Sequence, residues 1–205
     1  MANFRLPLPA PSESLALIGR SLELVLAQLA GPRAPIADMV KAYGRLLPGL
    51  RADPAFAEKP FDGISDLLFD LSRASNAVLG IATGHTSAGV GPALDALGWR
   101  GFFRTIQAAD MAPSKPHPGM LLQALAATDT EPRSAVFIGD TTFDMEMAHA
   151  AKLRSIGVGW GYHRAERPTA VGANRVAHTV GELRDYLQSF LLGELRDGPE
   201  RGRAD

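Results

Sequence analysis

One short segment, residues 135–144, constrains the fold of this chain more than any other. It begins with an apolar run, Ala-Val-Phe-Ile, which ends in Gly139-Asp140, and a second acid, Asp144, follows about one helical turn later. A run of this kind is typical of an interior strand of a parallel sheet. Ligands of open α/β sheets bind beyond the carboxyl ends of such strands. The segment therefore predicts a parallel sheet with Asp140 and Asp144 at its ligand-binding edge.

The spacing of the two acids has two interpretations. Two carboxylates this close repel each other unless a cation lies between them, and Mg²⁺ is the usual hard cation with oxygen ligands. In the alternative, Asp140 only ends its strand and Asp144 caps a helix over residues 145–151. Met145 and Met147 of that helix are interpreted as core residues.

The bulk properties exclude several classes of protein. The chain has 205 residues, 46% of them hydrophobic, and a formal net charge of −1. This balance predicts neither nucleic acid nor an anionic membrane as a partner. Without cysteine, disulfides and thiolate metal sites are excluded. No apolar run reaches the length of a membrane span and no signal-peptide pattern is present, so a cytoplasmic protein is expected.

The apolar periodicity divides the chain into two parts. Residues 1–55 are predicted to be a helical domain, with one helix from about Ser12 or Ser14 to Gly31 and another over residues 36–47 that ends before Pro48. Residues 56–193 alternate helices at 64–73, 88–97, 120–127 and 182–192 with strands at 78–82, 102–106, 136–138, 155–159 and 174–177. This alternation predicts an α/β fold with a Rossmann-like parallel sheet. The charged tail, 194–205, is predicted to be disordered.

Two other segments place chemically useful side chains near strand ends. Thr83-Gly84 follows the strand at 78–82, where a hydroxyl and close backbone amides can bind phosphate oxygens; the alternative is an ordinary turn. Lys115 lies in the proline-rich loop Pro-Ser-Lys-Pro-His-Pro, where a lysine can bind phosphate; the alternative is a surface lysine. The intervals between Thr83, Lys115 and Asp140 each suit a helix plus a strand or loop, so all three can meet at one sheet edge.

Together these residues resemble the haloacid dehalogenase superfamily, in the branch of phosphoglycolate phosphatases. The family's hydroxyl after the second strand is matched by Thr83, its Lys-Pro loop by Lys115, and its Gly-Asp-x-x-x-Asp motif by Asp140 and Asp144. The segment from Ile156 to His163 also resembles a glycine-rich segment of this branch. The resemblance implies that the helical half is a small cap domain.

The resemblance also implies a mechanism. An aspartate attacks phosphorus to give an aspartyl-phosphate, which water hydrolyses. Mg²⁺, bound by Asp140 and Asp144, and Lys115 neutralise charge on the phosphoryl oxygens, while Thr83 and Gly84 bind the phosphate. Asp144 acts through a water or holds the lysine. The substrate is a small phosphorylated metabolite.

The family's nucleophile motif, Asp-x-Asp-Gly-Thr at the end of the first core strand, does not occur in the sequence. The most similar segment is Asp70-Leu-Ser-Arg. It has serine in place of the second acid and arginine in place of the glycine, and it lies on a predicted helix. We therefore expect the first core strand to be absent, through truncation or a misplaced start, and the chain to be inactive. Trp160 and Tyr162 are interpreted as packing residues. His85, His117 and His163 could each line the pocket, and they are interpreted as loop residues bonded to backbone.

Three functions follow from these motifs. The first is a Mg²⁺-dependent phosphomonoester hydrolase, and the second is a non-catalytic relative that binds or assembles. The third is a phosphomutase or dehalogenase, of which the dehalogenase is disfavoured because it does not need the paired acids. The sequence identifies neither the metabolite nor the oligomeric state.

Overall fold

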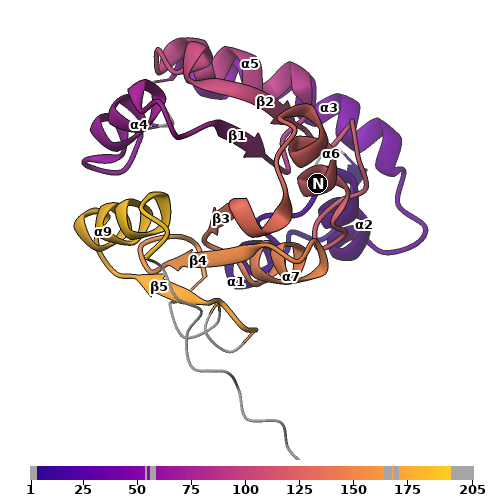
Figure 1. The fold of residues 1–205 in the computed structure, drawn as a ribbon. Helices are drawn as coiled ribbons and strands as arrows, with labels where there is room; N and C mark the ends of the chain where they lie inside the picture. Colours follow the sequence, from indigo (N-terminus) through magenta and orange to yellow (C-terminus); the bar gives the residue numbers. More distant parts are fainter. Residues whose placement is uncertain (1–3, 54, 56–58, 164–167, 169–170, 195–205) are drawn as a thin grey trace, which may run out of the picture.

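The computed structural model describes residues 4–53, 55, 59–163, 168 and 171–194 (Figure 1). Its α-helices are α1 (Pro11–Leu15), α2 (Leu22–Ala30), α3 (Ile36–Ala52), α4 (Ile64–Arg73), α5 (Ser87–Ala96), α6 (Gly119–Ala127), α7 (Thr142–Ala150) and α9 (Val180–Leu191). Its strands are β1 (Leu79–Ala82), β2 (Phe103–Gln107), β3 (Val136–Gly139), β4 (Arg154–Val158) and β5 (Arg175–Ala177). The predicted α/β fold is confirmed. The predicted disordered tail lies outside the described residues, except for Glu194.

The first predicted helix is wrong, because the chain breaks it into α1 and α2. Gly19 lies between them with a φ of +103°, which no α-helix contains. Helix α2 then begins afresh after Ser21, its N-cap residue. The apolar spacing continues through the break, which is why periodicity alone predicted one helix.

The predicted end of the second helix is also wrong. Helix α3 runs from Ile36 to Ala52 with Pro48 inside it. Pro48 cannot donate a backbone hydrogen bond to Gly44, so the helix loses one bond at this point. Beyond the proline, Arg51 Nη1 donates to the Gly89 carbonyl oxygen at 3.0 Å, which ties the last turn of α3 to helix α5. A tertiary contact therefore supports a turn that the proline disfavours.

The strands form two sheets that are not joined by hydrogen bonds. Strand β1 pairs in parallel with β2, and β3, β4 and β5 form a second parallel sheet in that order. In the described part of the chain, no strand pairs with the inner edge of β1 or of β3. Figure 1 shows the two sheets facing each other across an opening, with β1 above it and β3 below it.

Two apolar clusters cover the two faces of this split sheet. The first joins α6 to α7 and to the turn that follows α7. Its residues are Met120, Leu121, Leu125, Met147, Ala148, Ala151 and Leu153. The second joins α4 and α9 to β4 and β5: Leu67, Ile156, Val158, Ala177, Leu183 and Leu187. On the second face, Arg184 of α9 also donates to Asp70 of α4 at 2.6 Å. Side-chain packing therefore connects the halves that the strand ladder does not.

Asp110 is bonded to the start of helix α5. The backbone N–H and the hydroxyl of Ser87 donate to its two carboxylate oxygens at 2.8 Å and 2.6 Å. These bonds, the hydroxyl first, lower the pKa of Asp110 from its ordinary value. We predict that Asp110→Ala lowers the free energy of unfolding by about 1 kcal/mol at pH 7, as measured by urea denaturation.

The pH dependence of this effect has a definite sign. Because the carboxyl has the lower pKa in the folded state, its contribution is present above the unfolded pKa of about 3.9 and is lost as the pH falls through the folded value. The parent and Asp110→Ala are therefore expected to converge in stability in acid. A difference that stays constant down to the acid transition would contradict the assignment.

No helix among the described residues combines the length and the apolar character that crossing a bilayer requires.

Candidate functional site

Thr83 and Gly84 follow β1 directly. The Thr83 N–H donates to the Gln107 carbonyl oxygen at 2.9 Å, which continues the β1–β2 ladder by one residue. Its Oγ1 accepts the His85 N–H at 3.1 Å, so the hydroxyl hydrogen can be donated elsewhere. Gly84 lies close to another segment, because a Cβ there would be 2.7 Å from the carbonyl oxygen of Arg20. The Thr83 loop is thus held between the sheet and the N-terminal helices.

Lys115 is a buried cation paired with a buried acid. Its side chain is 7% exposed, that of Asp144 is 4% exposed, and Nζ lies 2.7 Å from Oδ1 of Asp144. The ammonium also lies 5.6 Å from the centre of the Phe137 ring. Burying a charge is costly unless it is paired and hydrogen-bonded, so this ion pair fixes the position of both residues. The alternative of a surface lysine is wrong.

Asp144 has both carboxylate oxygens engaged in this structure. While Oδ1 accepts from Lys115, Oδ2 accepts the N–H groups of Asp140 and Thr141 at 3.2 Å and 3.0 Å and the Thr141 hydroxyl at 2.8 Å. Thr141 caps α7 and forms a capping box with Asp144, so the helix begins at Thr142 and Asp144 is not itself the N-cap residue. The acid therefore holds the lysine, one of the two roles expected of it.

Asp140 lies at the end of β3, where the adjoining backbone leaves little space. Its Oδ2 accepts the Tyr162 N–H at 2.8 Å. A Cβ at Gly161 would be 2.1 Å from the Cβ of Asp140, and a Cβ at Gly139 would be 2.4 Å from that of Asp144. Real Cβ atoms do not approach this closely, so glycine is required at both positions. Gly161 lets the loop after β4 approach Asp140, and Gly139 lets Asp144 lie close to the end of β3.

All five predicted site residues line one pocket of about 890 Å³: Thr83, Gly84, Lys115, Asp140 and Asp144. The other walls come from the N-terminal helices, including Val25, Tyr43, Leu47 and Arg51, and from Tyr162. The predicted meeting of three segments at one sheet edge is therefore found in the structure. The pocket lies between that edge and helices α2 and α3, so its outer wall comes from the helical half.

The loop between α1 and α2 belongs to this pocket, and sequence reasoning missed it. Gly19 packs against Thr141, Arg20 places its guanidinium carbon 5.3 Å from the centre of the Phe143 ring, and the Ser21 N–H donates to Ser114 Oγ at 2.8 Å. These contacts join the helical half to both the Asp140 and the Lys115 segments. The only signal in the sequence was a glycine inside a helical pattern.

We predict that Gly19→Ala destabilises the protein by about 1–3 kcal/mol more than Gly31→Ala does. Both glycines have positive φ, +103° and +83°, so both substitutions strain the backbone. A Cβ at Gly19 would also be 2.8 Å from Thr141 Oγ1, whereas nothing lies within 4 Å of one at Gly31. Urea denaturation of the two variants isolates this contact, and equal losses would show that it carries no energy.

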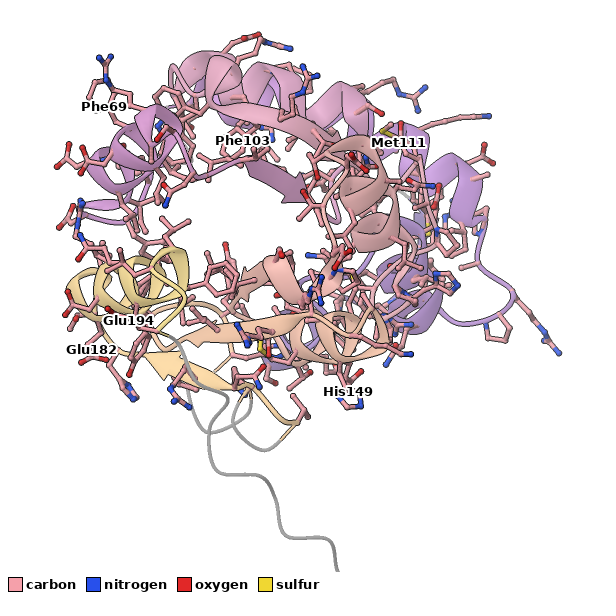
Figure 2. The ribbon with its side chains drawn as sticks, in the orientation of Figure 1. Phe69, Phe103, Met111, His149, Glu182 and Glu194 are labelled. Atoms are coloured by element: carbon pink, nitrogen blue, oxygen red, sulfur yellow. The ribbon has the colours of Figure 1, made fainter. Side chains whose placement is uncertain are left out.

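The remaining predicted residues divide into confirmed and wrong interpretations. Trp160 packs against the second apolar cluster, as predicted, and Nδ1 of His117 and of His163 accepts the Gly119 and Thr142 N–H groups. Tyr162 was interpreted as a packing residue, which is wrong, because it is 62% exposed and lines the pocket. His149 is not among the residues that line the pocket, and Figure 2 shows it pointing outward from α7.

The residues present can hold a magnesium ion only in part. Among the described residues, no group of three or more His, Asp or Glu side chains is arranged around a metal position. Of the two carboxylates in the pocket, Asp144 already accepts from Lys115 and Thr141, so Asp140 is the better candidate for a direct ligand. Mg²⁺ usually keeps several waters and needs only one or two carboxylates when a substrate phosphate is also bound, so Asp140 fits such a site as one ligand of several.

A comparison with known families matches residues 1–158 to the haloacid dehalogenase-like hydrolases. The chain belongs to this family. The match includes the segments of all five pocket residues, from Thr83 to Asp144, and the resemblance read from the motifs is confirmed.

Individual relatives include phosphatases. The chain is 31% identical over 162 residues to the N-acetylmuramic acid 6-phosphate phosphatase of Pseudomonas putida. The matched region covers 78% of this chain and 72% of that protein. It is also 31% identical over 155 residues to phosphoglycolate phosphatase 1 of Pseudomonas aeruginosa, and here the matched region covers 75% of this chain and 53% of that protein. A haloacid dehalogenase-like hydrolase from Streptococcus pneumoniae has a similar structure, with a TM-score of 0.75 and 26% identity over 91% of this chain and 86% of that one.

Proposed function

We propose that this protein is a Mg²⁺-dependent hydrolase of a small phosphorylated metabolite and acts in the cytoplasm. The observation that supports this proposal is the convergence of Thr83, Lys115 and Asp140 in one pocket, with Lys115 buried and fixed by Asp144. The phosphatase names of the relatives agree with it. Residues 1–55 would act as the cap that selects the substrate, because their helices form the outer wall of the pocket.

The cation and the hydroxyl would hold the phosphoryl group. An ammonium has three hydrogens, and Lys115 donates one of them to Asp144, which leaves others for phosphoryl oxygens. Because Asp144 fixes Nζ, little side-chain entropy is lost when the phosphate binds. Thr83 would donate its hydroxyl hydrogen to another oxygen of the same group, and Gly84 would allow the backbone to approach it.

Asp140 would hold Mg²⁺ together with waters and the substrate phosphate. When bound there, the ion would supply positive charge next to the phosphoryl oxygens. Tyr162 N–H keeps the carboxylate in position by donating to its Oδ2.

The described residues offer no carboxylate suited to attack phosphorus. The pocket has two carboxylates, Asp140 and Asp144, and the second is fully engaged by Lys115 and Thr141. Asp70 lies on α4 and pairs with Arg184, outside the pocket lining. We therefore infer that the attacking carboxylate comes from a polypeptide segment that the described residues do not include. Because the full sequence also lacks the family's Asp-x-Asp-Gly-Thr motif, we expect these 205 residues alone to turn over slowly or not at all.

A non-catalytic relative that binds phosphorylated metabolites is the second candidate. The missing nucleophile motif favours it, since the Lys115–Asp144 pair and Thr83 could bind a phosphate without cleaving it. A phosphomutase would use the same residues and differs in the fate of the phosphoryl group. The experiment below separates binding from hydrolysis.

The decisive measurement is phosphate release from a panel of phosphomonoesters, with Mg²⁺ or with EDTA. The present chain is compared with the same chain extended at its N-terminus by an apolar strand that ends in Asp-x-Asp. We expect the extended chain to be active only with Mg²⁺ and the present chain to be slower by about 10³-fold or more, because the nucleophile is lost.

Two substitutions in the extended chain serve as test and control. Asp140→Asn is expected to lower the rate about 100-fold or more, while Asp185→Asn, an exposed acid on α9 outside the pocket lining, leaves it unchanged. Activity of the present chain at the level of the extended one would refute the inference about the nucleophile. Inactivity of both, with phosphate bound by both, would establish the non-catalytic candidate.

A further inference from the structure

The Tyr162 N–H that donates to Asp140 belongs to a short backbone segment that needs support of its own. Gly161, before it, has no side chain and leaves the backbone conformationally free. The Tyr162 side chain is 62% exposed, so its burial does not anchor the segment either. His163, the next residue, is only 3% exposed. His163 is therefore the residue that can fix the position of the Tyr162 N–H.

His163 is bonded to the beginning of helix α7. Its Nδ1 accepts the Thr142 N–H at 3.1 Å, and Thr142 is the first residue of the helix. The first N–H groups of a helix have no partner within it, so an acceptor from elsewhere is needed there. The centre of the His163 ring also lies 6.0 Å from that of the Phe143 ring, and this contact restricts the orientation of the imidazole. His163 thus ties its own segment to α7 directly after the Asp140 turn.

The segment 161–163 contacts the segment 140–142 in sequence order. Gly161 lies against Asp140, where a Cβ would be 2.1 Å from that of the acid. Tyr162 donates its N–H to Oδ2 of Asp140 at 2.8 Å, and His163 accepts from Thr142. Because the bond at His163 follows the bond at Tyr162 by one residue, breaking it frees the backbone that holds the Tyr162 N–H on the carboxylate.

The imidazole has a polar role that packing alone does not require. An Nδ1 that accepts a hydrogen bond carries no hydrogen, so the ring hydrogen is on Nε2. Nε2 is buried and has no hydrogen-bond partner among the described residues. A buried donor without a partner is unfavourable, and an apolar side chain of similar size would avoid it. What the imidazole supplies, and an apolar side chain would not, is the acceptor for the Thr142 N–H.

We propose that His163 is a positioning residue for the metal site. By binding Thr142 it keeps the Tyr162 N–H on Asp140, and so fixes the carboxylate that holds the ion. The inference rests on the proposed function, in which Asp140 is a Mg²⁺ ligand. Groups that donate to a ligating carboxylate orient it and help to set the metal affinity. His163 is not among the residues that line the pocket, so it acts on the ion through Tyr162 and Asp140.

Two measurements on the 205-residue protein test this proposal. Solvent exchange of the Tyr162 amide, followed by NMR, reports the bond to Asp140. Water proton relaxation reports Mn²⁺ binding in the presence of inorganic phosphate. In His163→Leu, the Tyr162 amide is expected to exchange at least about tenfold faster, because the segment opens locally. Mn²⁺ is expected to bind about tenfold more weakly, because Asp140 loses its fixed orientation.

Two polar substitutions separate the hydrogen-bond acceptor from the size of the side chain. The amide oxygen of asparagine is the same number of bonds from Cα as Nδ1 of histidine, whereas that of glutamine is one bond further away. His163→Asn should therefore keep the bond to Thr142 and bring both measurements to within about twofold of the parent. His163→Gln should behave like His163→Leu.

A buried residue far from the site controls for a general loss of stability. Leu183, also 3% exposed, belongs to the second apolar cluster and is outside the pocket lining. Leu183→Ala should lower the free energy of unfolding, because it leaves a cavity in that cluster. The exchange rate of the Tyr162 amide and the Mn²⁺ affinity should stay at the parental values under native conditions.

The proposal is overturned if the Tyr162 amide of His163→Leu exchanges as slowly as in the parent, or if His163→Asn does not restore it. It is also overturned if Leu183→Ala speeds this exchange equally. If His163→Leu does not fold, the asparagine and glutamine variants decide the same point. A parent that binds no Mn²⁺ would count against the proposed function, and the exchange rates alone would then decide whether His163 positions Asp140.

Discussion

Asp144→Ala is expected to lower the free energy of unfolding by about 3–5 kcal/mol, which is the usual cost of leaving one partner of a buried ion pair unpaired. The variant leaves the Lys115 ammonium, 7% exposed, without its partner 2.7 Å away. It also removes the acceptor for the N–H groups of Asp140 and Thr141. Urea denaturation at pH 7 measures the loss. Glu146→Ala, at an exposed position on the same helix, is the control and should change stability little.

A double-mutant cycle shows how much of this loss is due to the stranded charge. Lys115→Met removes the cation, and the pair of substitutions removes both charges together. Because replacing a buried pair by apolar residues is often neutral, the double variant is expected to be more stable than the sum of the single losses implies. Additive losses would mean that Asp144 acts mainly by capping α7 and not by pairing with Lys115.

Met147→Ala is the second substitution with a large expected effect. It should lower the free energy of unfolding by about 2–5 kcal/mol. Met147 is 0% exposed and packs in the cluster that joins α7 to α6. Truncation leaves a cavity under the helix that carries Asp144. The midpoint of unfolding should therefore fall to a clearly lower temperature or urea concentration. Leu122→Ala, on the exposed face of α6, is the matched control and should cost less than about 1 kcal/mol. A small effect at Met147 would show that the cluster collapses to fill the space.

Most of the pocket could be predicted from the sequence because its residues follow strands that are recognisable from short apolar runs. Thr83 and Asp140 come directly after β1 and β3, and parallel strands bring their carboxyl ends to one edge. The interpretation of Met145 and Met147 as core residues is also confirmed, since they are 1% and 0% exposed.

Features that depend on contacts between distant residues could not be predicted. Nothing near Gly19 in the sequence indicates that it lies against Thr141 or that the chain has a positive φ there, at the break between α1 and α2. Tyr162 lies in the pocket because Gly161 lets its N–H reach Asp140. Helix α3 continues past Pro48, where Arg51 contacts Gly89. Each of these positions is decided by a partner many residues away.

The division of the strands into two sheets also affects how the protein unfolds. In an unbroken sheet, backbone hydrogen bonds transmit the loss of one strand to its neighbours, whereas here no such ladder connects β1 to β3 among the described residues. Cooperativity between the halves must pass through side-chain contacts, which include the two apolar clusters and the Asp70–Arg184 ion pair. The β1–β2 and β3–β5 units are therefore expected to open as separate units in native-state hydrogen exchange, with different opening free energies.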